Sequence, residues 1–164
     1  MDLVIRLAGL SDLETIAAYN AALADETEGL KLDSDRLRRG VGVVLADPSK
    51  GFYTVAERDG QVIGQMMITF EWSDWRNGVF WWIQSVYVHP AFRRQGIFRR
   101  LYHHVLRQAK NAGSVCGLRL YVEKENHRAQ QTYEGLGMQK TSYEVYEVDF
   151  VIERRTGSLL PLGH

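Results

Sequence analysis

The sequence has little cysteine and no long apolar run. Its single cysteine, Cys116, excludes a disulfide within the chain and fits a reducing compartment. No stretch approaches the roughly 20 apolar residues that a membrane-spanning helix needs. Residues 1–6 lack a basic segment followed by an apolar one, so we predict no signal peptide. These absences predict a cytoplasmic protein.

Neither sign of charge is in excess. The 164 residues include 20 Lys and Arg and 20 Asp and Glu, which gives a formal net charge of zero. Such a balance directs no field toward nucleic acid or an anionic membrane, so we expect neither as a partner. We also predict no metal site, because His103 and His104 are adjacent rather than four residues apart, and no cluster of Cys and His occurs.

The pattern of apolar residues predicts a single α/β domain over residues 1–150. Ser11 and Glu14 form a capping-box signature for a first helix. The acidic stretch 24–32 contains Gly29 and is interpreted as a loop or helix break. Asp33 or Ser34 is predicted to cap a second helix.

Strands and two further helices account for the rest of this domain. Helical spacing is clearest at residues 97–112, and a strand–helix–strand succession around it implies one parallel crossover. We therefore predict a single mixed, mostly antiparallel central sheet flanked by helices. Residues 151–164 form a C-terminal extension of unknown role. Asn77-Gly78 predicts a hairpin between a strand that ends near residue 72 and the strand 79–88. A last helix is predicted at residues 126–136. The predicted strands are residues 3–6, 52–57, 61–71, 79–88, 117–122 and 142–152.

The most informative stretch lies at residues 86–100. A β-branched and aromatic run ends at His89-Pro90, and an amphipathic helix begins after Gly96. A strand that leads through a glycine-containing turn into a helix points backbone N–H groups and the positive helix end at an anion. Arg93 and Arg94 add charge and a bidentate fork suited to phosphate. The stretch predicts a phosphate-binding turn.

Two motifs share the pattern of one known family. Residues 93–98 read Arg-Arg-Gln-Gly-Ile-Phe, and Asn126, Ala129 and Tyr133 precede a Leu-Gly turn. Together they resemble the GNAT superfamily of acyl-CoA-dependent N-acyltransferases, whose first motif is Arg or Gln, two residues, Gly, one residue, then Gly or Ala. Phe98 departs from this motif, because the family usually has a small residue there. The order of elements agrees over nearly all of residues 1–150.

The resemblance implies acetyl-CoA as acyl-donor cosubstrate, with no metal. The backbone of the strand before the turn would pair with the pantetheine arm, and N–H groups of the turn would hold the pyrophosphate. The second motif would line the other wall near the thioester. The predicted cofactor-binding residues are Val86, Tyr87, Val88, Arg93, Arg94, Gln95, Gly96, Ile97, Phe98, Arg99, Asn126 and Ala129.

The chemistry implied is transfer of an acetyl group to a primary amine by direct attack in a ternary complex. The tetrahedral oxyanion needs a preorganised donor, which a backbone N–H of residues 86–88 could supply. Tyr133 is the predicted general acid for the departing thiolate. Water or a carboxylate deprotonates the amine; Glu28 is ranked first because that loop commonly faces the acceptor in this family. The other candidate carboxylates are Glu26, Glu71 and Glu123.

The acceptor is predicted only by class. Acidic residues 25–28 favour a cationic amine, either a small molecule such as a polyamine or amino sugar, or a lysine or N-terminal amine of a protein. The predicted substrate contacts are Glu26, Trp72, Trp75 and Gln84.

Other interpretations stay open from the sequence. Gly96 could simply begin a helix, Asn126 is also a good N-cap, and Tyr133 could be a packed core residue. The alternative function is a non-catalytic acyl-CoA-binding sensor or interaction module, although a sensor needs no acid at Tyr133. A homodimer through the last strands, or through the tryptophan hairpin at residues 72–76, is also left open.

Overall fold

The computed structural model describes residues 2–153. The chain divides into two compact units, Met1–His127 and Arg128–His164. Most of the predicted C-terminal extension, residues 154–164, lies outside the described residues. The elements of the first unit are β1 (Val4–Leu7), α1 (Leu13–Glu28), α2 (Ser34–Ala46), β2 (Phe52–Arg58), β3 (Gln61–Ser73), β4 (Gly78–Val88), α3 (Ile97–Asn111) and β5 (Val115–Leu120).

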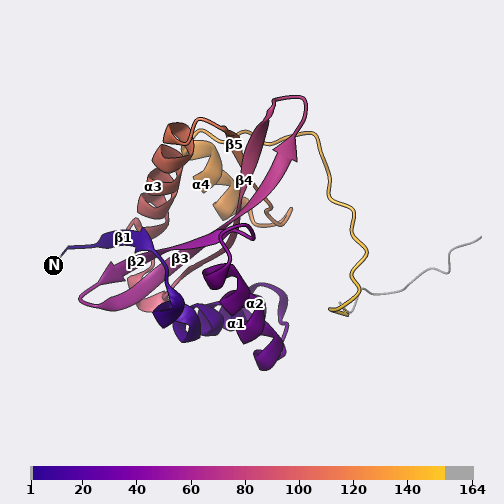
Figure 1. Cartoon of the computed structure of the whole chain (residues 1–164). Coiled ribbons are helices and arrows are strands. Elements are labelled where there is room, and N and C mark those ends of the chain that lie inside the picture. Colours follow the sequence, from indigo (N-terminus) through magenta and orange to yellow (C-terminus); the bar gives the residue numbers. More distant parts are fainter. Residues whose placement is uncertain (1, 154–164) are drawn as a thin grey trace, which may run out of the picture. The chain divides into compact units, whose positions relative to one another are not determined.

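A five-stranded sheet organises the first unit (Figure 1). The strands lie in the order β1-β2-β3-β4-β5. The pairs β1–β2, β2–β3 and β3–β4 are antiparallel, and β5 is parallel to β4. The β4–α3–β5 connection is therefore the single parallel crossover that the sequence predicts. The mixed, mostly antiparallel sheet flanked by helices is confirmed.

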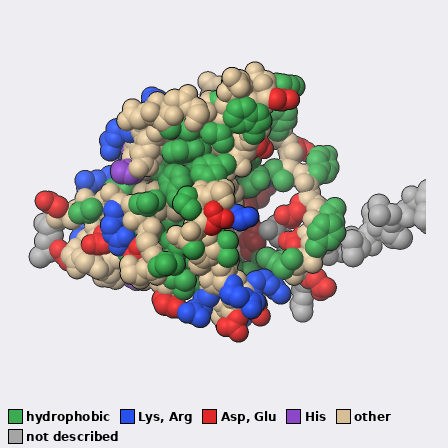
Figure 2. All heavy atoms as spheres, viewed as in Figure 1, with side chains coloured by type: hydrophobic (Ala, Val, Ile, Leu, Met, Phe, Trp, Pro, Cys, Tyr) green, Lys and Arg blue, Asp and Glu red, His purple; other side chains and the backbone are tan. Residues whose placement is uncertain are grey.

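Helices cover both faces of this sheet. α1 and α2 lie on one face and α3 on the other (Figure 1). Ile16 of α1 and Val41 of α2 pack with Tyr53 and Val55 of β2 in a buried cluster. Charged side chains of both signs lie interspersed on the face seen in Figure 2, as the zero net charge would suggest.

α3 packs closely on the sheet because β3 has a glycine beneath it. A Cβ built on Gly64 would lie 3.0 Å from Cγ2 of Ile97, the first residue of α3, and 3.4 Å from the carbonyl oxygen of Tyr87. Gly64 also pairs with Val88, the last residue of β4. The start of α3 is therefore held at the end of β4.

The predicted break at residues 24–32 exists but begins later, at Gly29. α1 continues through Glu28 and ends at Gly29, which has the left-handed φ of 62° and donates its N–H to the Asp25 carbonyl at 3.0 Å. Residues 25–28 are thus the last helical turn rather than a loop. The predicted capping box at Ser11 is wrong, because the Asp12 carboxylate accepts the Gly9 N–H at 2.9 Å. The N-cap at Asp33 is confirmed, since its carboxylate accepts the Arg36 N–H at 2.7 Å.

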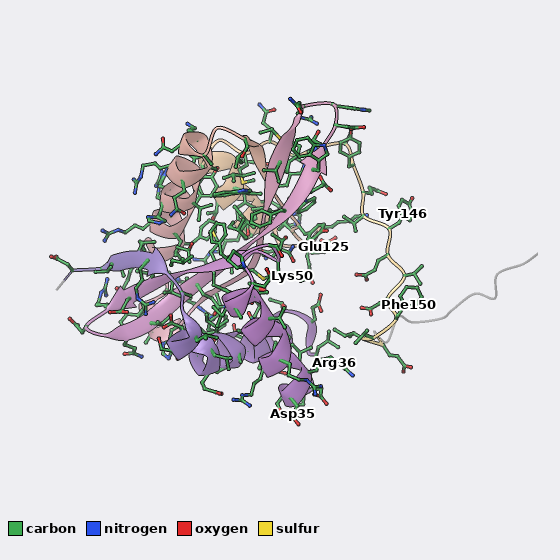
Figure 3. The ribbon with its side chains drawn as sticks, viewed as in Figure 1. Asp35, Arg36, Lys50, Glu125, Tyr146 and Phe150 are labelled. Atoms are coloured by element: carbon green, nitrogen blue, oxygen red, sulfur yellow. The ribbon has the colours of Figure 1, made fainter. Side chains whose placement is uncertain are left out.

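The second unit contains most of α4 (His127–Gly135) and an extended segment after it. The predicted strand at residues 142–152 is wrong: this part of the chain forms neither helix nor strand. Its alternating apolar side chains are instead exposed, including Tyr146 and Phe150, which project from the segment in Figure 3. The alternation satisfies the local requirement for a strand, but within the described residues no neighbour completes a ladder.

Candidate functional site

The two central strands separate along the sheet. β4 pairs with β5 from Val79 to Ile83, where Ile83 is opposite Leu120, the last residue of β5. Residues 84–88 continue to pair with β3. Along this stretch, β4 has no strand of the described chain on its other side. Unpaired main-chain N–H and C=O groups at such an edge can bind an extended ligand as an added strand.

A β-bulge lies where this separation begins. Met67 is opposite Gln84 and Gln65 is opposite Tyr87, so β4 contains one more residue than β3 between these pairs. Within the bulge, Ser85 has a left-handed φ of 49°. A non-glycine residue in this region is strained, and surrounding contacts must hold it there.

The turn after β4 presents backbone donors, as the sequence predicts. A short 3₁₀ helix (Pro90–Phe92) leads to Arg94 and Gly96, which have positive φ values of 63° and 74°. Gly96 is the residue before α3, whose first N–H groups lack helical partners. Successive amides near left-handed residues form anion-binding concavities. The donor set therefore fits a pyrophosphate.

Position 96 requires glycine because of its backbone conformation, not because of a lack of space. Nothing lies within 4 Å of the Cβ that another residue would place there. The requirement for glycine comes from the positive φ, because left-handed backbone is costly for residues with a Cβ.

Arg93 braces the turn against the end of α1. Its Nε donates to the Val88 carbonyl at 2.9 Å, and its guanidinium pairs with Glu26 at 2.8 Å. The other Glu26 oxygen accepts a hydrogen bond from the Tyr87 hydroxyl at 3.1 Å. Both oxygens of Glu26, a predicted substrate contact, are thus used within the fold. Burial, together with the Glu26 carboxylate, raises the pKa of Tyr87 above its ordinary value.

Some side chains of the first motif contact the rest of the fold, and others are exposed. The Gln95 side chain accepts a hydrogen bond from Arg58 at 3.0 Å. The Ile97 side chain is buried and that of Phe98 is half-buried, its ring 6.3 Å from Tyr102. These side chains therefore serve the fold, while the exposed side chains of Arg94 and Arg99 can reach an anion.

The predicted substrate contacts are not brought together. Trp72 and Trp75 are 63% and 85% exposed at the β3–β4 hairpin, where Trp72 is opposite Val79 near the start of β4 and Trp75 lies in the turn. Glu26 lies at the opposite end of that strand through its contact with Tyr87. Gln84 lies between them, and its amide donates to the Thr69 hydroxyl at 2.5 Å.

The remaining predicted residues are placed within their own elements. Glu28 is exposed in the last turn of α1, and Asn126 is exposed immediately before α4. Ala129 and Tyr133 lie one helical turn apart on α4. Burial raises the pKa of Tyr133 above its ordinary value near 10, so the phenol keeps its proton throughout the neutral pH range.

Sequence reasoning missed a buried polar group beneath the bulge. Gln65 on β3 is fully buried and donates from Nε2 to the Asn20 side chain at 2.8 Å and to the Ser85 carbonyl at 3.0 Å. Asn20 in turn donates to the Tyr53 hydroxyl at 3.0 Å. A signal was present, because Gln65 interrupts the apolar run of residues 62–68.

Two further properties concern only the described residues. They contain no group of three or more His, Cys, Asp or Glu side chains arranged to hold a metal ion. None of their helices combines the length and hydropathy that crossing a membrane requires.

Comparisons place this geometry among known proteins. The model of the acetyltransferase (GNAT) family matches residues 14–138. The structure of a possible acetyltransferase from Clostridium difficile 630 is 47% identical, with a TM-score of 0.85, over 92% of this chain and 99% of that one. None of the curated proteins matches the chain.

Two more distant structures share the fold. A predicted acetyltransferase with acetyl-CoA from Clostridium acetobutylicum is 21% identical over 90% of this chain and 96% of its own, with a TM-score of 0.73. AAC(6')-Iy in complex with the bisubstrate analog CoA-S-monomethyl-acetylneamine is 19% identical over 92% of this chain and 100% of its own, with a TM-score of 0.72.

Proposed function

Because the chain belongs to the GNAT family of acetyltransferases, we propose that it transfers the acetyl group of acetyl-CoA to a primary amine by direct attack in a ternary complex. One observation carries the proposal. The edge of β4 becomes free after Ile83 and leads, within a few residues, into the left-handed turn at Gly96. An extended arm ending in a pyrophosphate matches this edge and this turn in order.

The residues that would hold acetyl-CoA follow from that order. Backbone groups of residues 86–88 would pair with the pantetheine arm, and N–H groups of residues 94–99 would hold the pyrophosphate, with the Arg94 and Arg99 side chains adding charge. Asn126 and Ala129 are proposed for the second wall. Bound acetyl-CoA supplies an activated thioester carbonyl.

Three groups of this chain are assigned to the reaction. A backbone N–H of the β4 edge would donate a hydrogen bond to the oxygen on which negative charge develops. Tyr133, a phenol that carries its proton at neutral pH, would donate it to the leaving thiolate. Glu28, or water, would accept the proton of the attacking ammonium. Glu26 is less suited to this role because Arg93 and Tyr87 already bind both of its oxygens.

The acceptor is proposed as a cationic amine. Asp25 and Glu28 are exposed acidic side chains in the last turn of α1, whose Glu26 contacts the end of β4. Carboxylates at this position would attract an ammonium group. A polyamine or amino sugar is the first candidate, and a protein amine stays a second candidate.

A calorimetric titration with acetyl-CoA tests the proposal, with dephospho-CoA as the comparison. Micromolar binding followed by acetylation of an amine in a screen would support it, and weaker binding of dephospho-CoA would indicate contacts with the ribose phosphate. Binding without turnover on any amine would favour the non-catalytic sensor. A folded protein that binds neither ligand would exclude both functions.

A further inference from the structure

We propose that Gln65, Asn20 and Tyr53 form a buried clamp on Ser85 that holds the β4 bulge and thereby positions the backbone edge for acetyl transfer. The inference rests on the proposed function for its catalytic consequence. These three residues come from β3, α1 and β2, so the clamp connects three elements to one strained residue. None of them is assigned a contact with substrate or cofactor; they are positioning residues.

The direction of every hydrogen bond in the clamp can be worked out from the Ser85 carbonyl. This oxygen can only accept, so the Gln65 atom 3.0 Å away must be the amide nitrogen. The same nitrogen lies 2.8 Å from Asn20, which must present its oxygen. The Asn20 nitrogen then donates to the Tyr53 hydroxyl at 3.0 Å. Neither the Gln65 nor the Asn20 side-chain amide can therefore be flipped without losing a hydrogen bond.

Tyr53 completes the clamp on the far side of Asn20. Its hydroxyl accepts from the Asn20 amide at 3.0 Å, and Asn20 accepts from Gln65 at 2.8 Å. The Ser85 hydroxyl donates to the Met67 sulfur at 3.9 Å. Ser85 is thus held at its carbonyl by Gln65 and at its hydroxyl by Met67, which accounts for a serine keeping a φ of 49°.

The orientation of Gln65 is maintained at a cost. With its nitrogen directed to two acceptors, its buried Oε1 finds no partner among the described residues. Buried polar atoms without a partner are rare, and each calls for an explanation. The hydrogen bond to the Ser85 carbonyl explains the unpartnered Oε1, because the flipped Gln65 amide could not donate to that carbonyl.

The position of Ser85 connects the clamp to the site. It lies two residues after the last β4–β5 pair, at Ile83, and immediately before the edge at residues 86–88. A change of φ at Ser85 would rotate the backbone that follows and redirect its N–H groups. An oxyanion donor must be aligned before reaction, so loosening the clamp should slow catalysis more than it weakens binding at the Gly96 turn.

The test compares Gln65→Met, which keeps the side-chain volume but removes both donated bonds, with Tyr53→Phe. The matched controls are Gln61→Met, in the same strand but exposed, and Tyr102→Phe, which removes the hydroxyl of a buried tyrosine in α3. Amide hydrogen exchange, affinity for CoA, Tm, kcat and KM are measured for all four variants.

We expect Gln65→Met to lower kcat about 10- to 100-fold with little change in CoA affinity. Amides of residues 85–88 should exchange about tenfold faster, while those of α3 keep their rates. Tyr53→Phe should show the same pattern more weakly, and both controls should behave as the unaltered protein.

Two results would overturn the clamp. One is an unchanged kcat and unchanged exchange at residues 85–88 in both clamp variants. The other is faster exchange throughout the sheet and α3 in both, which would make the residues merely structural. If Gln65→Met does not fold, Tyr53→Phe carries the test alone. If the unaltered protein binds no acetyl-CoA, the proposed function fails, whereas the exchange measurement still decides whether the clamp holds the bulge.

Discussion

At the scale of single residues, backbone conformation accounts for Gly96 more fully than space does. Gly96 and Gly113 flank the same helix, and both have φ values above 70° with open space where a side chain would be. They differ only in which helix end they serve. Gly96 precedes the N–H groups of α3, whereas Gly113 follows its carbonyl end. Substitutions at the two glycines can therefore distinguish a loss of stability through backbone strain from a loss of ligand binding at the turn.

Replacing either glycine by valine tests this separation. Left-handed backbone costs about 1–2 kcal/mol for a residue with a Cβ, so both variants should lose similar stability. Only Gly96→Val should also weaken CoA binding, by about tenfold, because the turn must be driven back to its strained form. Calorimetry and thermal unfolding provide the two readouts. Equal affinities for the two variants would contradict the placement of the phosphate turn.

Tyr133 gives the residue-scale prediction on chemistry. Tyr133→Phe should lower kcat about 100-fold while CoA affinity is kept, since general acids contribute on this scale. Tyr143→Phe, which alters an exposed tyrosine of the same unit, should have no effect. Because burial raises the pKa of Tyr133, the loss of activity that follows its deprotonation should begin only above about pH 10. A Phe variant with full kcat would remove Tyr133 from the mechanism.

At the scale of elements, the start of α1 depends on an ion pair between a half-buried arginine and a buried aspartate. Arg6 on β1 binds Asp12 through two nitrogens, at 2.8 and 2.9 Å, and also binds Glu57 on β2. The Arg6 hydrogen bonds hold the pKa of Asp12 below its ordinary value despite burial, and the Gly9 N–H acts in the same direction. This arrangement connects the first strand to the first helix.

Asp12→Asn should destabilise the fold by about 1–3 kcal/mol at pH 7. A depressed carboxyl pKa stabilises the folded state above the unfolded value near 3.9, and that contribution is lost as pH falls through the folded pKa. The difference from the unaltered protein should therefore shrink below about pH 4. Urea unfolding at several pH values measures it, with the exposed Asp2→Asn as control. A difference independent of pH would exclude the ion pair as its cause.

The elements also show where sequence patterns succeed and fail. α3 was predicted closely because its apolar face and the glycine before it are both local features. The end of α1 was misplaced because acidic composition at residues 25–28 resembles a loop, whereas Gly29 is the residue that ends the helix. The strand at residues 142–152 was predicted from alternation alone. A strand also needs a partner, which no local pattern specifies.

For the site, predictability followed the same division between local and long-range features. The turn at Gly96 could be predicted because strand, turn and helix are consecutive in the chain. The Glu26–Arg93 pair joins residues 67 positions apart. The clamp brings together Asn20, Tyr53, Gln65 and Ser85 from four elements, and only the polar interruption at Gln65 hinted at it.

At the scale of the whole molecule, ligand binding should be visible as stability. A ligand that binds only the folded state at 100 times its Kd adds about 2.7 kcal/mol. For a chain of this size, that corresponds to a rise in Tm of about 5–10 °C. Thermal scans with acetyl-CoA should show this rise, and Gly96→Val should need a correspondingly higher ligand concentration. An unchanged Tm at saturating concentrations would argue against a built cofactor site.

The length of β4 has a consequence for how substitutions combine. The strand extends about 30 Å from Gly78 to Val88, with the exposed tryptophan hairpin at one end and the braced turn at the other. Free-energy changes at sites this far apart usually add when no partner is shared. Epistasis between the hairpin and the turn should therefore be weak, and libraries varied at the hairpin can be recombined with turn variants without rescreening every pair.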